Sequence, residues 1–467
     1  MTPFDGWTVP AGAGDLLGEQ RAESARRAVA YPVLSSEGMR GLCAFLRNSR
    51  EVLLSHAVRD IAASLGAVGA RFASEGDPLR EEALSLLPHS AGISPPMAEL
   101  VLDGMARDWT EPRLLELLEA EFTDPRVLDT FQAGDRGSSR VLGLPLTLHI
   151  GAGTVPGVSV TSLIRALLVK SAVLVKPGLG DVVLPNLYLR GLQEHDPEVA
   201  SAAAVLYWPG GGGSTSDGES AALAEADAVI AYGNDDTIRD VRERTPASTR
   251  IVAYHYRLSL GLVGAAALAG DEVARSTVAS IARAVATFDQ RGCVSPHLVY
   301  VEQGGAVSPA GLAGLLAESL ETLERDLPSG AITPEEASAV HQIRGAAELR
   351  MAAGEDVAMY SGGEAPWTVI YEAVPDFKPS CLNRVVRVAP VRRLVDVVPH
   401  LARVRRHLQT VAVAGAGEAE AELHESLARA GALRITGFDD APWPPPWWHH
   451  DGVGPLTALV RWVDAEG

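Results

Sequence analysis

The sequence predicts an α/β protein built on parallel β-sheets, and two observations carry this prediction. Short apolar segments, each ending in glycine, proline or a polar turn, recur between residues 140 and 256: RVLGLPLTLHIGAG, SAVLVKPG, AAAVLYWPGGGG, ADAVIAYGND and TRIVAYHY. Helical segments such as VSVTSLIRALLVK and ESAALAEA separate several of them. Strands that alternate with helices at this spacing form a parallel sheet, and ligands bind such sheets beyond the carboxyl ends of the strands.

The elements on either side of this region follow from periodicity. Residues 15 to about 125 space their apolar residues at helical intervals, which predicts a helical N-terminal region with Cys43 packed on an apolar face. Residues 271–290 form an amphipathic helix that leads to a turn containing Cys293 and then to the strand HLVYVEQ. A second αβ region follows to about residue 440, with CLNRVVRVAPV and LQTVAVAGAG as strands.

Length and charge limit what the protein can be. With 467 residues the chain is long enough for two or three domains, and 47% hydrophobic and 21% charged content is ordinary for a globular protein. The formal net charge of −19 argues against a nucleic-acid partner and against an anionic membrane surface, because both attract clustered lysine and arginine.

Cysteine usage and the first residues predict a reducing, cytoplasmic setting. The three cysteines are widely spaced and form no CxxC pair, so no disulfide framework or zinc knuckle is expected. The N-terminus lacks the basic start and apolar core of a signal peptide. Residues 141–164 carry no charge, but four glycines and two prolines divide this stretch, so we expect no membrane span.

Two stretches at predicted strand ends carry candidate binding chemistry. Only three of the 40 basic residues are lysines, and Lys176 closes the strand of VLVKPG, where an ammonium can bind a ribose or a phosphate. A lysine that merely extends to solvent at the strand edge fits equally well. The glycines of WPGGGG suit either a pyrophosphate or a flexible loop, and they do not form a GxGxxG fingerprint.

Cys293 lies at a turn, in RGCVSPH, rather than inside an apolar segment. A preceding helix end, exposed amides and Arg291 would favour its thiolate, whereas a lone cysteine in a turn is often inert. Other candidates are weaker. Adjacent His449 and His450 in PWPPPWWHHDG point to opposite sides of an extended loop, so we expect a packing loop there and no metal site.

In combination and in this order, these stretches resemble the aldehyde dehydrogenase superfamily, most closely its acyl-CoA reductases of the LuxC type. The segments that carry the resemblance span residues 90 to 465: LHIGAGTVPG, LIRALLVKSAVLVKPGLGD, RGCVSPH, CLNRVVRV, LQTVAVAG and WWHHDG with LVRWVDAE. The resemblance implies an aldehyde dehydrogenase-like fold with a helical region (1–125), a dinucleotide-binding domain (126–268), a catalytic domain (269–445) and a C-terminal arm (446–467). The arm resembles an oligomerisation strand, which implies a homo-oligomer.

The resemblance also assigns roles to residues. It makes Cys293 the acyl-accepting nucleophile and places Gly153 and Thr154 near the thioester oxygen, with Thr154 where aldehyde-oxidising members carry asparagine. The cofactor-binding candidates are Lys176, Pro177, Gly178, Gly210, Gly211 and Gly233. The candidates near the substrate are Arg291, which would also favour the thiolate, His297, which would tune Cys293 or begin the strand, Asn383, and Arg384, which would face CoA phosphates.

A missing carboxylate favours one of two reactions of this superfamily over the other. Aldehyde-oxidising members carry a glutamate before the cysteine that activates water, but residues 250–270 contain no Asp or Glu. Without that base the acyl-cysteine persists, which favours reduction of an acyl thioester to an aldehyde. His255 is the one substitute in this stretch, so oxidation of an aldehyde stays an alternative, as does a non-catalytic partner of an acyl-transfer protein.

The resemblance leaves the cofactor and the acyl donor to be inferred. NADPH is expected rather than NADH, because Leu179 stands where NAD-preferring relatives often place glutamate, although Asp181 lies close in sequence. The acyl thioester is carried by CoA, a carrier protein or a partner enzyme. The family suggests an acyl-activating or acyl-transferring partner protein.

Overall fold

The computed structural model describes residues 3–24, 28–134, 137–210 and 217–466, which form two compact units. The first contains Met1–Gly92, Ala98–His255 and Pro445–Gly467, and the second contains Ile93–Met97 and Tyr256–Pro444. The expected helical region and C-terminal arm are therefore parts of the first unit rather than separate domains. The main boundary falls at residue 255 rather than 268, because β12 (Leu258–Val263) pairs with strands of the second unit, β13 and β17.

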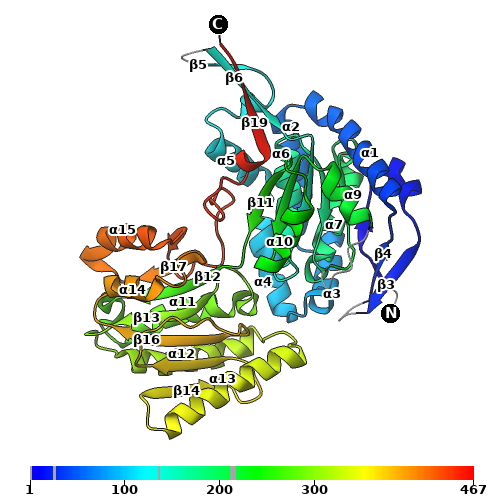
Figure 1. Ribbon diagram of the computed structural model, residues 1–467. Helices are drawn as coiled ribbons and strands as arrows, with labels where there is room; N and C mark the ends of the chain where they lie inside the picture. The colour runs from blue at the N-terminus through cyan, green and yellow to red at the C-terminus, as the bar shows by residue number, and fades with distance from the viewer. Residues whose placement is uncertain (1–2, 25–27, 135–136, 211–216, 467) are drawn as a thin grey trace. The chain divides into compact units, whose positions relative to one another are not determined.

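The sheet of the first unit has the strand order β11-β10-β7-β8-β9-β2, parallel except for β2 (Figure 1). Its order reverses between β7 and β10, which is where ligands bind in open α/β sheets. This arrangement confirms the predicted α/β class. The strands are β2 (Trp7–Thr8), β7 (Leu146–Ile150), β8 (Ala172–Lys176), β9 (Ala203–Leu206), β10 (Ala228–Tyr232) and β11 (Arg250–Tyr254).

Helices cover both faces of this sheet. Helices α1, α9 and α10 lie on one face, and α6 and α7 lie on the other with α2 and α3 packed outside them. Local signals set several starts, such as Ser35 and Asn234, whose side chains accept from backbone N–H groups of α1 and α10. The helices are α1 (Ser36–Ser55), α2 (Val58–Ala73), α3 (Pro78–Ala91), α4 (Pro95–Arg107), α5 (Glu111–Glu121), α6 (Val158–Leu168), α7 (Val183–His195), α8 (Pro197–Ala200), α9 (Asp217–Glu225) and α10 (Asp235–Arg244).

The sequence analysis expected helices from residue 15 onward. The structure instead has strands before the first α-helix, α1, begins at Ser36. Strands β3 (Gln20–Ser24) and β4 (Ala28–Pro32) pair antiparallel, and β1 (Phe4–Asp5) adds to β4. The segment AVAYP favours a strand because Val29 is buried while its neighbours are half-buried. Cys43 is buried in α1 as predicted, and burial raises its pKa to about 12.

The chain end returns to the first unit as a strand. β19 (Val460–Ala465) pairs antiparallel with β6 (Gly137–Gly143), and β5 (Gln132–Gly134) completes a three-stranded sheet (Figure 1). Among the described residues, no single helix has the length and apolar character to cross a membrane, although the bent pair α1 and α2 passes that test when taken together.

The second unit is built on a seven-stranded sheet of order β14-β15-β16-β13-β12-β17-β18, in which only β14 is antiparallel. Helices α11 and α12 cover one face, α14 and α15 cover the other, and α13 packs against β14 (Figure 1). The strands are β12, β13 (Pro296–Glu302), β14 (Val357–Ser361), β15 (Thr368–Glu372), β16 (Val385–Val391), β17 (Leu408–Ala414) and β18 (Arg434–Thr436). The helices are α11 (Asp271–Ala286), α12 (Pro309–Asp326), α13 (Pro334–Ala352), α14 (Val398–Leu401) and α15 (Glu420–Ala430).

Candidate active site

Cys293 lies in the short turn between α11 and β13, in the second unit. Its side chain is half-buried. Its carbonyl oxygen accepts a hydrogen bond of 2.6 Å from Oγ of Ser259 on β12. The same Oγ accepts the backbone N–H of Thr410 on β17 at 3.0 Å. The buried Ser259 hydroxyl therefore fastens the cysteine turn to two central strands.

Two left-handed segments precede and flank this turn. Of the eight non-glycine described residues with positive φ, six belong to the runs Phe288–Gln290 and Leu382–Arg384. Non-glycine residues in this conformation cost about 1–3 kcal/mol each and persist only where their surroundings enforce them. The backbone N–H of Asn383 donates to the carbonyl of Asp289 at 3.1 Å and joins the two runs. Such concentrated strain is typical of functional sites.

A buried ion pair locks the two runs together. The Arg384 side chain is 1% exposed and lies 2.7 Å from the Asp289 carboxylate, and it also bonds Glu324 at 2.8 Å and the carbonyl of Leu327 at 2.8 Å. The expectation that Arg384 faces CoA phosphates is therefore wrong, because its guanidinium is enclosed among these protein partners. Asn383 is 1% exposed, and neither polar atom of its amide has a hydrogen-bond partner among the described residues.

The other candidates near Cys293 are also held by the protein. His297 is 2% exposed at the start of β13, and its Nδ1 accepts the backbone N–H of Ser380 at 3.0 Å. Burial lowers the pKa of His297 to about 4, so the ring is neutral at pH 7. The Arg291 guanidinium lies 3.6 Å from Glu336 and donates to the carbonyl of Ala331 at 3.3 Å. His297 thus holds the segment at Ser380, and Arg291 holds the segment at Ala331 and Glu336.

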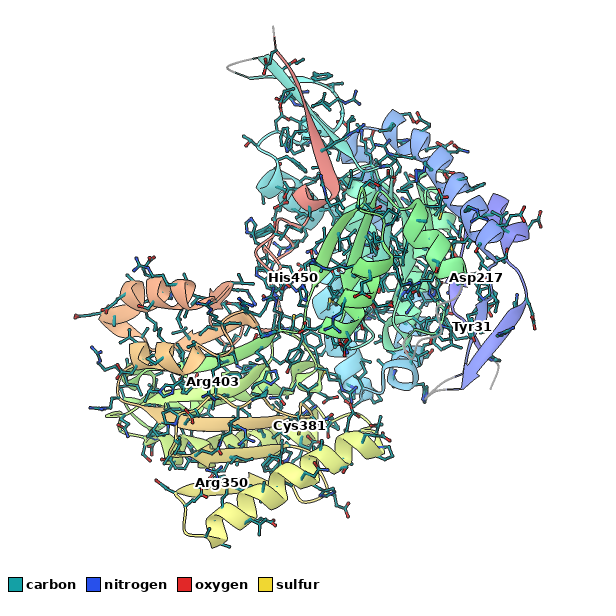
Figure 2. The ribbon with its side chains drawn as sticks, in the orientation of Figure 1. Tyr31, Asp217, Arg350, Cys381, Arg403 and His450 are labelled. Carbon is teal, nitrogen blue, oxygen red and sulfur yellow. The ribbon has the colours of Figure 1, made fainter. Side chains whose placement is uncertain are left out.

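The structure adds a residue that sequence reasoning missed. Arg434, at the start of β18, donates to the carbonyls of Ala441 at 2.8 Å and Asp440 at 2.7 Å. Burial lowers the pKa of Arg434 to about 10, and the negative charges of Asp440 and of the Cys293 thiolate oppose that shift. No motif marks it; the only signal is an arginine in a short strand late in the chain. Cys381 is half-buried beside Asn383, and burial raises its pKa (Figure 2).

Lys176 and Gly210 come together at the carboxyl edge of the first unit's sheet. Lys176 is 8% exposed, and its Nζ lies 5.9 Å from the centre of the Tyr207 ring. A Cβ at Gly210 would lie 3.1 Å from that Nζ, so glycine leaves room beside the ammonium. Gly233 directly follows β10, which is separated from β8 by β7, and it has no space for a side chain, because a Cβ would lie 2.8 Å from Thr237. Gly211 lies outside the described residues.

The candidates Gly153 and Gly178, together with Gly180, allow the loop after β7 to pack against the loop after β8. A Cβ on Gly178 would lie 2.3 Å from the backbone N of Gly153, and one on Gly180 would lie 2.2 Å from the carbonyl oxygen of Gly153. The loop after β7 and the loop after β8 therefore meet backbone to backbone. Pro177 is buried in the second loop, and Thr154 is exposed in the first.

The Asp181 side chain binds the backbone N–H groups at the N-terminus of α6. Its carboxylate accepts the backbone N–H groups of Gly157 at 2.6 Å and Ser159 at 2.8 Å, and the residue is 1% exposed. Burial raises the pKa of Asp181 to about 7, while these hydrogen bonds oppose the shift. Because the carboxylate occupies the positive end of the helix, this end does not receive a phosphate.

The C-terminal loop packs through its aromatic rings, as predicted. The His450 ring stacks on Tyr254 at 4.3 Å and on Trp448 at 4.5 Å, and Tyr254 stacks on Tyr232 at 4.5 Å (Figure 2 labels His450). These rings attach the loop to β10 and β11. In the described part of the chain, no three His, Cys, Asp or Glu side chains come together as a metal site.

Comparison with known proteins decides the family. The model of the acyl-CoA reductase (LuxC) family matches residues 54–462. The chain belongs to this family. It is 26% identical over 404 residues to the long-chain acyl-protein thioester reductase of Aliivibrio fischeri, covering 85% of this chain and 80% of that protein. It is 24% identical over 452 residues to the protein of the same name from Photobacterium phosphoreum, covering 94% and 86%.

Solved structures confirm the aldehyde dehydrogenase-like fold of this LuxC-family chain. Methylmalonate-semialdehyde dehydrogenase from Oceanimonas doudoroffii superposes with a TM-score of 0.74 at 13% identity, covering 100% of this chain and 98% of that one. NADP-dependent glyceraldehyde-3-phosphate dehydrogenase from Bacillus halodurans superposes with a TM-score of 0.71 at 13% identity, covering 99% and 98%.

His297 gives the folded protein a predictable sensitivity to acid. Because its pKa is about 4 when folded and about 6.5 when unfolded, only the unfolded chain binds its proton between these values. The contribution of neutral His297 to the free energy of unfolding is therefore fully present above about pH 6.5. It is lost as the pH falls to about 4, and the total loss is on the order of 3 kcal/mol.

Urea denaturation at pH 7.5 and pH 5 tests this. The difference in unfolding free energy between the two pH values should shrink in His297→Gln relative to the wild type. His424→Gln, at a half-exposed ring beside Glu420, should leave the difference unchanged. An undiminished difference in His297→Gln would contradict the prediction.

Proposed function

We propose that this protein reduces an acyl thioester to an aldehyde through an acyl-enzyme on Cys293, with NADPH as the reductant. The observation that carries the proposal is the cysteine turn itself. A half-buried thiol follows a strained, doubly anchored backbone segment in a member of the acyl-CoA reductase family. A cysteine that only fills space needs no such anchoring.

The first half of the reaction belongs to residues of this chain. The Cys293 thiolate attacks the thioester carbonyl carbon and a new C–S bond forms. The C–S bond to the donor then breaks, and the donor leaves as a thiolate that takes its proton from solvent. We assign the backbone N–H of Cys293 as a donor to the oxygen that gains charge. Residues 250–270 carry no Asp or Glu to activate water. His255, the one substitute, lies 3.5 Å from Asp235. The absence of an acidic residue from this stretch supports reduction over hydrolysis.

The first unit offers groups that fit a dinucleotide. Lys176 suits a ribose or a phosphate at the carboxyl edge, and Gly210 leaves space beside its Nζ. The Asp181 carboxylate is committed to the start of α6. It therefore offers no acceptor to a 2′-hydroxyl, which supports NADPH over NADH. When bound, the nicotinamide supplies the hydride that converts the acyl group to the aldehyde and frees the thiolate.

Cofactor preference is testable at Leu179, which is half-buried directly after Gly178. Leu179→Glu should lower kcat/KM for NADPH about 10- to 100-fold and leave kcat/KM for NADH nearly unchanged. The reason is that a carboxylate there repels a 2′-phosphate bound at Lys176. We take this repulsion to be comparable to the strength of a charged hydrogen bond, about 1.5–3 kcal/mol. Steady-state kinetics with both cofactors measure the ratio. Leu179→Gln controls for size, and equal ratios in the two variants would contradict the assignment.

The acyl donor and the assembly are also proposals. The relatives named above are acyl-protein thioester reductases, which supports a protein-bound acyl group, delivered by an acyl-transferring partner, beside acyl-CoA. A homo-oligomer formed through the chain end is supported by β19, an edge strand whose Trp462 is 52% exposed. The three cysteines form no disulfide, which supports a cytoplasmic location.

Intact-mass spectrometry tests the proposed reaction. The protein is incubated without cofactor with acyl-CoAs of several chain lengths and with an acylated carrier protein. NADPH is then added, and the aldehyde is measured. A mass increase equal to one acyl group, discharged as aldehyde by NADPH, is expected. Discharge as free acid would favour a hydrolytic enzyme, and NAD⁺-dependent acid formation from an aldehyde would favour the oxidation alternative.

A further inference from the structure

We propose that a cavity between strand β4 and Trp208 binds the adenine ring of an adenosine that carries a ribose phosphate, and that Arg21 binds this phosphate. The inference deepens the proposed function and rests on it, because it takes the first unit to be the one that binds the cofactor. All residues that carry it belong to the first unit.

The cavity has a volume of about 150 Å³ and a mostly apolar lining. Strand β4 and the residues after it form one wall, and the segment that follows β9 forms the other. A cavity of roughly this size accommodates an aromatic ring. Both Arg21 and Pro209 are exposed, so the space opens to solvent and leaves room for a ribose outside it. The lining residues include Arg21, Tyr31, Leu34, Met39, Trp208 and Pro209.

Two aromatic side chains of the lining are held in place. Trp208 is 7% exposed, and its indole N–H donates to the Glu219 carboxylate at 2.6 Å. The same carboxylate accepts from Arg244 at 2.6 Å, which anchors it in turn. On the other wall, the Tyr31 ring packs edge to face on Tyr207, with 5.8 Å between the ring centres. Bases stack on aromatic side chains, so these rings suit adenine.

Arg21 lies at the open side of the cavity. It is the register partner of Tyr31 in the antiparallel pair of β3 and β4, and directly opposed side chains lie on the same face of such a pair. The Arg21 side chain is 59% exposed and lies 3.8 Å from Glu19, which is 75% exposed. Exposed ion pairs of this kind contribute little, so Arg21 exchanges Glu19 for a bound phosphate at small cost.

The cavity adjoins the candidates for dinucleotide binding. The Lys176 Nζ lies 5.9 Å from the centre of the Tyr207 ring, on which Tyr31 packs. Gly210, whose Cβ would lie 3.1 Å from that Nζ, directly follows the lining residue Pro209. A dinucleotide whose ribose binds Lys176 therefore has its adenine within reach of the cavity.

The nearby start of α9 does not suit the phosphate. The backbone carbonyl of Asp217 accepts from Ser36 Oγ at 3.1 Å, which places the first turn of α9 beside the segment that follows β4 (Figure 2 labels Tyr31 and Asp217). That turn carries Asp217 and Glu219, whose carboxylates repel an anion from the positive end of the helix. We therefore assign the phosphate to the guanidinium of Arg21.

Two molecules of the proposed reaction contain a phosphorylated adenosine. NADPH carries an adenosine 2′-phosphate, and coenzyme A carries an adenosine 3′-phosphate. Because the cavity lies beside Lys176, at the edge of the sheet assigned to the cofactor, we expect NADPH to supply the adenosine.

Isothermal titration calorimetry of the full chain tests this with adenosine 2′,5′-bisphosphate, adenosine 3′,5′-bisphosphate and adenosine 5′-monophosphate. The wild type should bind the 2′,5′-bisphosphate about 10- to 100-fold more tightly than the monophosphate, as expected for hydrogen bonds between charged groups. Arg21→Gln should weaken binding of the 2′,5′-bisphosphate about tenfold and leave the monophosphate unchanged. Preference for the 3′,5′-bisphosphate, lost in Arg21→Gln, would support the site with coenzyme A as the source.

Two further variants separate the site from the fold. Tyr31→Ala should weaken all three nucleotides about tenfold or more, because it removes a stacking surface, whereas Tyr31→Phe keeps the ring and should preserve binding. Arg59→Gln is the matched control: its side chain is 68% exposed and lies 4.0 Å from Glu119, and its loss should change no affinity. Failure of the wild type to bind either bisphosphate, unchanged affinities in Arg21→Gln or Tyr31→Ala, or an equal loss in Arg59→Gln would overturn the inference.

The titration needs neither a thioester nor Cys293. A protein that binds the nucleotides as described but forms no acyl adduct would refute the proposed reaction and leave this inference standing. A protein that forms the adduct but whose nucleotide affinities do not depend on Arg21 would refute this inference alone.

Discussion

Cys293→Ala should form no acyl adduct and should lose aldehyde formation by on the order of 10⁴-fold or more, because removing a covalent nucleophile leaves only binding and charge stabilisation. Its fold should survive. The side chain is half-buried, and the Ser259 hydroxyl contacts the backbone carbonyl at position 293 rather than the sulfur. Intact mass after incubation with the reactive acyl donor, and aldehyde release on adding NADPH, measure the two losses.

Cys381→Ala is the matched control for this loss. It removes the other half-buried thiol, which adjoins the left-handed run Leu382–Arg384. Burial raises the pKa of Cys381, so its thiolate is scarce at neutral pH and the acyl adduct should persist in this variant. An adduct that survives Cys293→Ala and disappears in Cys381→Ala would reassign the nucleophile.

Arg384→Met should have the largest effect on stability, lowering the free energy of unfolding by about 3–5 kcal/mol. The substitution leaves the carboxylates of Asp289 and Glu324 without the cation that pairs with both. The Asp289 side chain is only 3% exposed, so water does not replace the lost partner. Urea denaturation, with the midpoint and the slope both recorded, measures the change.

Arg393→Met provides the comparison. Arg393 pairs with Asp396 at 3.1 Å, but its side chain is 71% exposed. Solvent-exposed pairs contribute about 0–1 kcal/mol. If the free energy of unfolding fell by similar amounts in Arg384→Met and Arg393→Met, the buried ion pair of Arg384 would not stabilise the fold more than an exposed pair does. Adding Asp289→Asn to Arg384→Met should recover part of the loss, because it removes a buried unpaired charge.

Local sequence was sufficient for the α/β class, for the turn of Cys293 and for the position of Lys176. Each follows from features within a few residues: apolar runs that end in glycine, the periodicity of residues 271–286, and a lysine closing a strand. The Asn234 cap also belongs to this class, because the accepting side chain and the donating N–H of Thr237 lie within one helical turn.

Contacts between distant segments could not be predicted in this way. The sequence analysis directed Arg384 to CoA phosphates, yet the fold encloses it against Asp289, on another element. It left open whether Asp181 lies beside a bound cofactor, and the fold commits that carboxylate to α6. It missed Arg434, because only the order of β12, β17 and β18 brings that arginine to the cysteine turn. Periodicity and turn chemistry are local and can be predicted from neighbouring residues, whereas strand order sets which distant side chains share a buried space, and burial then fixes their charges and partners.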